Sequence, residues 1–152
     1  MMTLKPGLAL LMMLLGGGPG PGPGCSSTAE CGCLRGNVSA CAALAQAEPA
    51  LAASMRAARS TYEVAAAGGK HSGFLQNVLR QRWGQAQYKK GITSLQNHIE
   101  KHQAWINEPS TKLKHWEKLS PEHQRHLLEH WRTEITTAQE QIGILRVLWA
   151  SL

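Results

Sequence analysis

Two long stretches of this 152-residue chain repeat their apolar positions at alternating spacings of three and four. In residues 86–107 the repeat falls on Tyr88, Ile92, Leu95, Ile99, His102 and Ile106. In residues 121–149 it falls on Leu128, Trp131, Ile135, Ala138, Ile142, Leu145 and Trp149. This spacing places one apolar stripe along each of two helices. Helices with matching stripes and a connection of about a dozen residues should pack as an antiparallel hairpin. Since no segment alternates with a period of two, the predicted fold class is all-α.

The ends of both long helices carry recognisable signals. Asn107, Glu108 and Pro109 should stop the first helix. Ser120, Pro121 and Glu122 combine an N-cap, a proline at the first helical position and a carboxylate in the first turn. The second helix should therefore start at residue 121.

The N-terminus, residues 1–24, is typical of an export signal. Lys5 supplies a positive charge, and Leu8–Leu15 forms an apolar segment. The Gly/Pro run of residues 16–24 indicates a flexible spacer. The following CSST sequence resembles the start of a bacterial lipoprotein, which implies acylation of Cys25 and anchoring in the outer membrane. Residues 25–36 would then form a lipid-anchored tether. A freely secreted protein is the alternative.

All four cysteines lie between Cys25 and Cys41, in a chain bound for an oxidising compartment. With a lipid on Cys25, three cysteines remain, which predicts one disulfide and one free thiol. The disulfide would join Cys41 to either Cys31 or Cys33. A metal site is not expected in this region, because Glu30 is the only acidic or histidine neighbour.

Residues 37–67 form an Ala-rich segment. Alanine is the best helix former, and Pro49 fits the first turn of a helix, so we expect two helices over about 38–47 and 49–67. These helices have few large apolar residues and should present the domain that follows. Gly68 and Gly69 end them, and residues 68–152 form the predicted C-terminal helical domain, with a further helix over about 74–82.

The amino-acid composition excludes some kinds of catalytic site in that domain and favours one class of substrate. The chain contains no Asp, which excludes Ser-His-Asp triads and nuclease sites that need aspartate. The formal charge of +6 suits a polyanion such as RNA. His71 lies in a Gly-rich loop and could transfer protons, while Lys70, Arg80 and Lys89 could stabilise a phosphoryl group. Trp83, Tyr88 and Trp116 could stack on bases. The alternative for His71 is an exposed loop residue with no chemical role.

Two histidine pairs have the spacing i, i+4 that can bind zinc, namely His98 with His102 and His126 with His130. His102 falls on the apolar stripe of its helix, but His126 falls off the other stripe. The two pairs would also have to meet at one level of the hairpin. A solvated or structural role is therefore favoured, and we expect no metal and no cofactor.

The stretch from Gly69 to Leu148 resembles a small C-terminal domain of bacterial polymorphic toxins. The resemblance rests on GKHSGF (69–74), KKGITSLQNHIEKH (89–102), the Asn-Glu-Pro break (107–109) and LLEHWRTEITTAQEQIGIL (127–145). Together with the lipoprotein-like start, the chain is similar to the swarming-inhibition lipoprotein toxins of social gliding bacteria.

The resemblance implies a lipid-anchored antibacterial toxin that neighbouring cells exchange between outer membranes and that acts inside the recipient. It also implies a cognate immunity protein as partner. We expect the toxin domain to be a nuclease, with a metal-independent ribonuclease favoured. The alternative is a non-enzymatic helical outer-membrane lipoprotein that binds a partner in the cell envelope.

Overall fold

The computed structural model describes residues 24–152, and this part of the chain is all-α. It contains six α-helices and two short 3-10 helices, with no strand among the described residues. The α-helices are α2 (Thr28–Leu34), α3 (Val38–Ala47), α4 (Pro49–Ala66), α5 (Ser72–Gln81), α6 (Gln85–Asn107) and α7 (Pro121–Ala150). The 3-10 helices are η1 (Pro109–Thr111) and η2 (Trp116–Lys118). The predicted export signal lies outside the described residues, except for Gly24.

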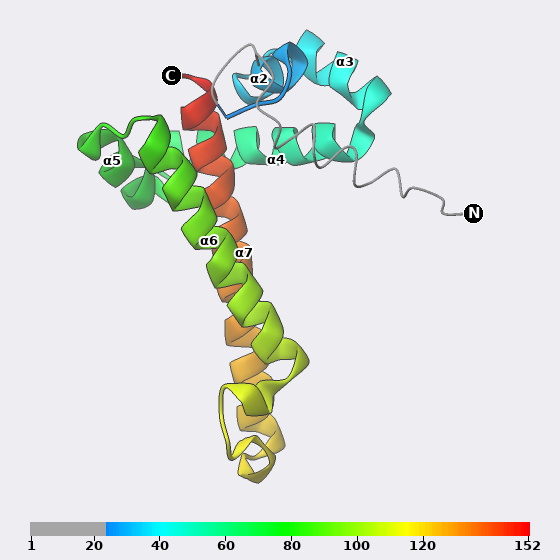
Figure 1. Cartoon of the computed structure of the whole chain (residues 1–152), viewed down its shortest axis with the longest axis vertical. Helices are drawn as coiled ribbons and strands as arrows, with labels where there is room; N and C mark the ends of the chain where they lie inside the picture. The colour runs from blue at the N-terminus through cyan, green and yellow to red at the C-terminus, as the bar shows by residue number, and fades with distance from the viewer. Residues whose placement is uncertain (1–23) are drawn as a thin grey trace.

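The predicted antiparallel hairpin is confirmed: α6 and α7 run side by side in opposite directions and form the long axis of the molecule (Figure 1). Their limits agree with the predicted 86–107 and 121–149 to within one residue. Ser120 caps α7, since its hydroxyl accepts a hydrogen bond from the His123 amide at 3.1 Å. The apolar stripes face each other, and Ile92, Ile142 and Leu145 are buried between the helices.

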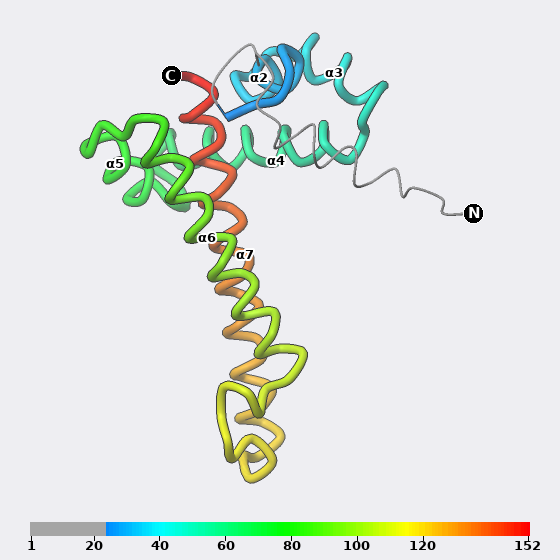
Figure 2. The backbone as a smooth tube through the Cα atoms, viewed as in Figure 1, coloured from blue at the N-terminus to red at the C-terminus, as the bar shows by residue number. Residues whose placement is uncertain are grey.

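Helix α4 crosses α7 near the C-terminal end of the hairpin, which we call the base (Figure 2). The face of α4 that packs there carries Ala52, Met55, Ala58 and Ala65, all buried. The approach is close, because a Cβ on Gly143 would lie 3.1 Å from the Cα of Ala58. Small residues on both helices therefore allow their backbones to come together. The predicted Ala-rich helices are both present.

The prediction of a tether over residues 25–36 was wrong. Residues 28–34 form α2, whose N-cap Ser27 accepts a hydrogen bond from the Glu30 amide at 3.1 Å. Cys31 and Leu34 lie three residues apart on the buried face of this helix, and Cys33 is buried beside them. Cysteine packs as a small hydrophobic residue, so this face joins the core around Met55 and Val147.

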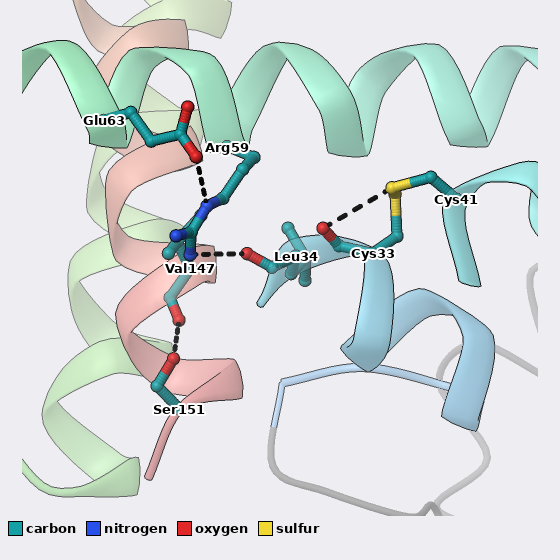
Figure 3. A network of polar contacts seen from close by, with 7 residues as sticks. All are labelled: Cys33, Leu34, Cys41, Arg59, Glu63, Val147 and Ser151. Carbon is teal, nitrogen blue, oxygen red and sulfur yellow. Dashed lines mark hydrogen bonds and ion pairs between the residues drawn. A yellow bond between two sulfur atoms is a disulfide. The ribbon is translucent and has the colours of Figure 1, made fainter. Parts of the chain in front are cut away.

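Two disulfides link all four cysteines, Cys33 with Cys41 and Cys25 with Cys31. The first joins α2 to α3 (Figure 3) and confirms one of the two predicted pairings. The predicted free thiol does not occur. Because one sulfur cannot form both a disulfide and the thioether of a lipoprotein, the Cys25–Cys31 disulfide and the predicted acylation of Cys25 are alternatives, and acylation stays a prediction.

Arginine side chains fasten the N-terminal helices to one another and to the base. Arg35 Nε donates a hydrogen bond to the Ala150 carbonyl at 2.7 Å, across 115 residues of sequence. Arg59 on α4 pairs with Glu63 at 2.9 Å and donates to the Leu34 carbonyl at 3.4 Å (Figure 3). In residues 24–152 no helix is both long and apolar enough to cross a membrane.

Candidate functional site

The loop between α4 and α5 holds the predicted Lys70 and His71. Gly68 has φ of 93°, and the Ser72 amide donates to the Gly69 carbonyl, which closes a tight turn. His71 is the N-cap of α5 and itself has φ of 71°, an uncommon conformation for a residue with a side chain. This backbone places the side chains of residues 70 and 71 beside α7.

Both side chains meet the same carboxylate, that of Glu140 on α7. Lys70 Nζ lies 2.8 Å from Glu140 Oε1, and His71 Nε2 lies 3.5 Å from Glu140 Oε2. The Lys70 hydrogen bond, with the charges of Lys70 and His71, lowers the pKa of Glu140 despite its partial burial. Glu140 is therefore a carboxylate at neutral pH, held between two basic groups.

The environment of His71 differs from that of an exposed loop residue. Its side chain is only 7% exposed. Its Nε2 atom is buried and makes no hydrogen bond, so the contact with Glu140 is an ion-pair approach without hydrogen-bond geometry. A buried imidazole nitrogen facing a carboxylate is an arrangement that proteins use for proton transfer.

A cleft of about 510 Å³ lies between α4, α6 and α7, and Glu140 is part of its wall. Its volume is within the range of small-molecule sites. The polar part of the wall comes from Ser54, Thr61, Gln96, Thr136, Gln139 and Arg146. Glu140 thus belongs both to this cleft and to the contact with Lys70 and His71.

Arg80 and Lys89 do not join this group. Arg80 lies in the last turn of α5, about 13 Å along the helix from His71. Lys89 lies near the start of α6, and both residues are exposed. Neither side chain makes an ion pair or hydrogen bond with any described residue. The four predicted residues therefore do not form one constellation.

Two of the three aromatic residues predicted to stack on bases are unavailable for that role. Tyr88 and Trp116 are 4% and 8% exposed, so they belong to the packed interior. Trp83 is half-buried against Tyr88, with ring centroids 5.5 Å apart. Burial raises the pKa of Tyr88, consistent with its place in the core.

The two histidine pairs, His98 with His102 and His126 with His130, do not come together at one site. His98 and His102 on α6 face Glu134 of α7, and the possible ligand atoms of these three residues lie within 4.8 Å of one another. His130 approaches the same carboxylate, with Nε2 3.9 Å from Glu134 Oε1. His126 is exposed and lines a shallow depression with His123 and Glu129. The sequence reasoning missed both Glu134 and Glu140.

Comparisons with protein-family models, with curated proteins and with solved structures found no match to this chain.

Proposed function

We propose that this chain is an exported antibacterial toxin whose helical C-terminal part cleaves RNA without a metal ion. The observation that carries the proposal is the convergence of Lys70 and His71 on Glu140 at the wall of the cleft. The net charge of +6 suits a polyanionic substrate. The Cys25–Cys31 disulfide favours free secretion over lipid anchoring. A cell that makes such a toxin would need a cognate immunity protein.

Cleavage of RNA by its own 2′-hydroxyl requires a base, an acid and a cation. In our proposal Glu140 takes the proton from the 2′-hydroxyl, because its lowered pKa keeps it ionised. The 2′-oxygen bonds to phosphorus, the bond from phosphorus to the 5′-oxygen breaks, and protonated His71 gives its proton to the leaving oxygen. Lys70 stabilises the negative charge on the phosphoryl oxygens.

Through its hydrogen bond to Glu140, Lys70 links substrate binding to the basicity of the Glu140 carboxylate. The Lys70 side chain is 61% exposed, so it is free to turn toward a phosphate. Loss of its hydrogen bond would remove the main cause of the lowered Glu140 pKa. The carboxylate would then become a stronger base when the substrate is bound.

The test uses the chain from residue 24 onward, purified with its disulfides formed and incubated with total bacterial RNA in excess EDTA. We expect cleavage that leaves 2′,3′-cyclic phosphate ends. His71→Gln and Glu140→Gln should each lower the rate by about 10²-fold or more. Arg80→Gln is the matched control, because Arg80 lies outside the site, and it should stay active. Intact RNA with the unmodified protein, or a folded His71→Gln variant of full activity, would refute the proposal.

The burial of the His71 side chain favours a second candidate function, that of a non-enzymatic exported protein that binds a partner in the cell envelope. Here the contacts of Lys70 and His71 with Glu140 serve to hold the α4–α5 loop against α7. This candidate predicts that His71→Gln changes the unfolding temperature while RNA stays intact with every variant. RNA cleavage by the unmodified chain separates the two candidates, and circular dichroism of the same samples reports the unfolding temperatures.

A further inference from the structure

Three side chains that commonly bind metals meet halfway along the hairpin, away from His71. His98 and His102 lie one helical turn apart on α6, so their side chains share a face. Their rings are in contact, with centroids 4.0 Å apart. Across the interface, Glu134 Oε2 lies 3.2 Å from His98 Nε2.

A backbone hydrogen bond fixes the tautomer of His102. Its Nδ1 lies 2.8 Å from the carbonyl oxygen of His98. A carbonyl can only accept, so Nδ1 carries the proton and neutral His102 presents the lone pair of Nε2. Histidines that bind metals are commonly oriented by such a hydrogen bond at the second ring nitrogen. His102 is therefore prepared as a ligand before any ion arrives.

The surroundings of His102 restrict water. The residue is 7% exposed, and its ring packs on Trp105 with centroids 4.5 Å apart. Trp105 packs in turn on Trp131, which stacks on Trp116. The aromatic cluster thus covers His102, whereas the side chains of His98 and Glu134 are 41% and 39% exposed and can be reached from solvent.

From this geometry we propose that His98, His102 and Glu134 bind one zinc ion, which joins α6 to α7. Two imidazoles and a carboxylate suit Zn²⁺, whereas Mg²⁺ and Ca²⁺ prefer oxygen ligands alone. Zinc bonds of about 2.0–2.1 Å place tetrahedral ligand atoms roughly 3.3 Å apart. His98 and Glu134 already have that separation, and the possible ligand atoms of all three residues lie within 4.8 Å of one another. Water or His130 completes the coordination.

The test is calorimetric titration of the untagged, oxidised chain with zinc chloride. We expect one ion per chain and a higher unfolding temperature with zinc. Glu134→Gln keeps the shape of the side chain and His98→Ala changes a half-exposed residue, so both variants should fold, as circular dichroism will check. Each should lower the affinity by more than about tenfold. His123→Ala removes an exposed histidine of α7 outside the cluster and should leave the affinity unchanged.

A second measurement reports the geometry of the site directly. Cobalt(II) bound by these ligands should give the intense visible absorption of tetrahedral coordination, and this band should disappear in the Glu134→Gln variant. Absence of one-to-one zinc binding, or equal affinity of the His98→Ala and unmodified chains, would overturn the proposal. RNA cleavage is measured in EDTA, so the outcome of either test does not decide the other.

Discussion

Substitution of Met55 by Ala tests whether the Ala-rich helices and the hairpin fold as one unit. Met55 on α4 is 1% exposed and lies in the core that includes Cys33, Leu34 and Val147. The change removes three heavy atoms, which at about 0.8 kcal/mol for each buried methylene-sized group gives about 2.4 kcal/mol. The cavity left behind adds to this, so we expect a loss of about 3 kcal/mol in the free energy of unfolding.

The measurement is urea denaturation followed by circular dichroism and by tryptophan fluorescence. Trp105, Trp116 and Trp131 lie in the half of the hairpin away from α4, whereas Trp83 and Trp149 lie at the base. Fluorescence is therefore measured in a chain that carries Trp83→Phe and Trp149→Phe, where it reports on a region that Met55 does not contact. With a denaturant slope of about 1–3 kcal/mol/M, both signals should shift together to lower urea by about 1–3 M. Val64→Ala, at a position 49% exposed on the same helix, should change the stability by less than about 0.5 kcal/mol.

The reasoning would be refuted if, in the Met55→Ala variant, the circular dichroism transition moved to lower urea while the fluorescence transition stayed unchanged. The Ala-rich helices would then unfold separately from the hairpin. The shared core of α4 and α7 would contribute little to stability, and residues 68–152 could be studied as an independent domain.

Three further predictions concern pH and the disulfides. The lowered pKa of Glu140 stabilises the protein above the ordinary value of 4.5, and this contribution is lost as pH falls through the lowered value. The difference in unfolding temperature between the unmodified chain and Glu140→Gln should therefore vanish in acid; a constant difference would contradict it. Burial raises the pKa of Tyr88, so stability should fall as pH rises above 10.0, and Tyr88→Phe should reduce that fall in alkaline denaturation curves. Replacing Cys33 and Cys41 together by Ser should cost about 2–3 kcal/mol in urea denaturation, because their disulfide spans a separation of 8 residues; an unchanged midpoint would count against this pairing.

The hairpin was predictable because the sequence signals for its two helices lie within the helices themselves and at their ends. The alternating spacing of Ile92, Ile99, Ile142 and Leu145 defines an apolar stripe on each helix, and Ser120 with Pro121 marks a helix start. Such signals depend on neighbours within a few residues, so they need no knowledge of the tertiary structure. Pro49 likewise marked the start of α4 correctly.

The parts that could not be predicted depend on contacts between distant residues. Helix α2 has only seven residues, and its buried face is built largely from cysteines, which carry little weight in a hydrophobic pattern. Glu140 and Glu134 resemble any other exposed glutamate of a long helix. The register of α6 against α7 sets Glu134 opposite His98, and the turn at Gly68 sets His71 beside Glu140.

The hydrogen bond from the Arg35 side chain to the Ala150 carbonyl has a mechanical consequence. It holds the beginning and the end of the described chain together at the base, where α2, α4 and α5 surround the hairpin (Figure 1). Only α6, α7 and the short turns η1 and η2 continue to the opposite tip. With its 30 residues, α7 is about 45 Å long. The hairpin therefore has the geometry of a lever arm: a tilt of about 10° at the base would move the tip by about 8 Å.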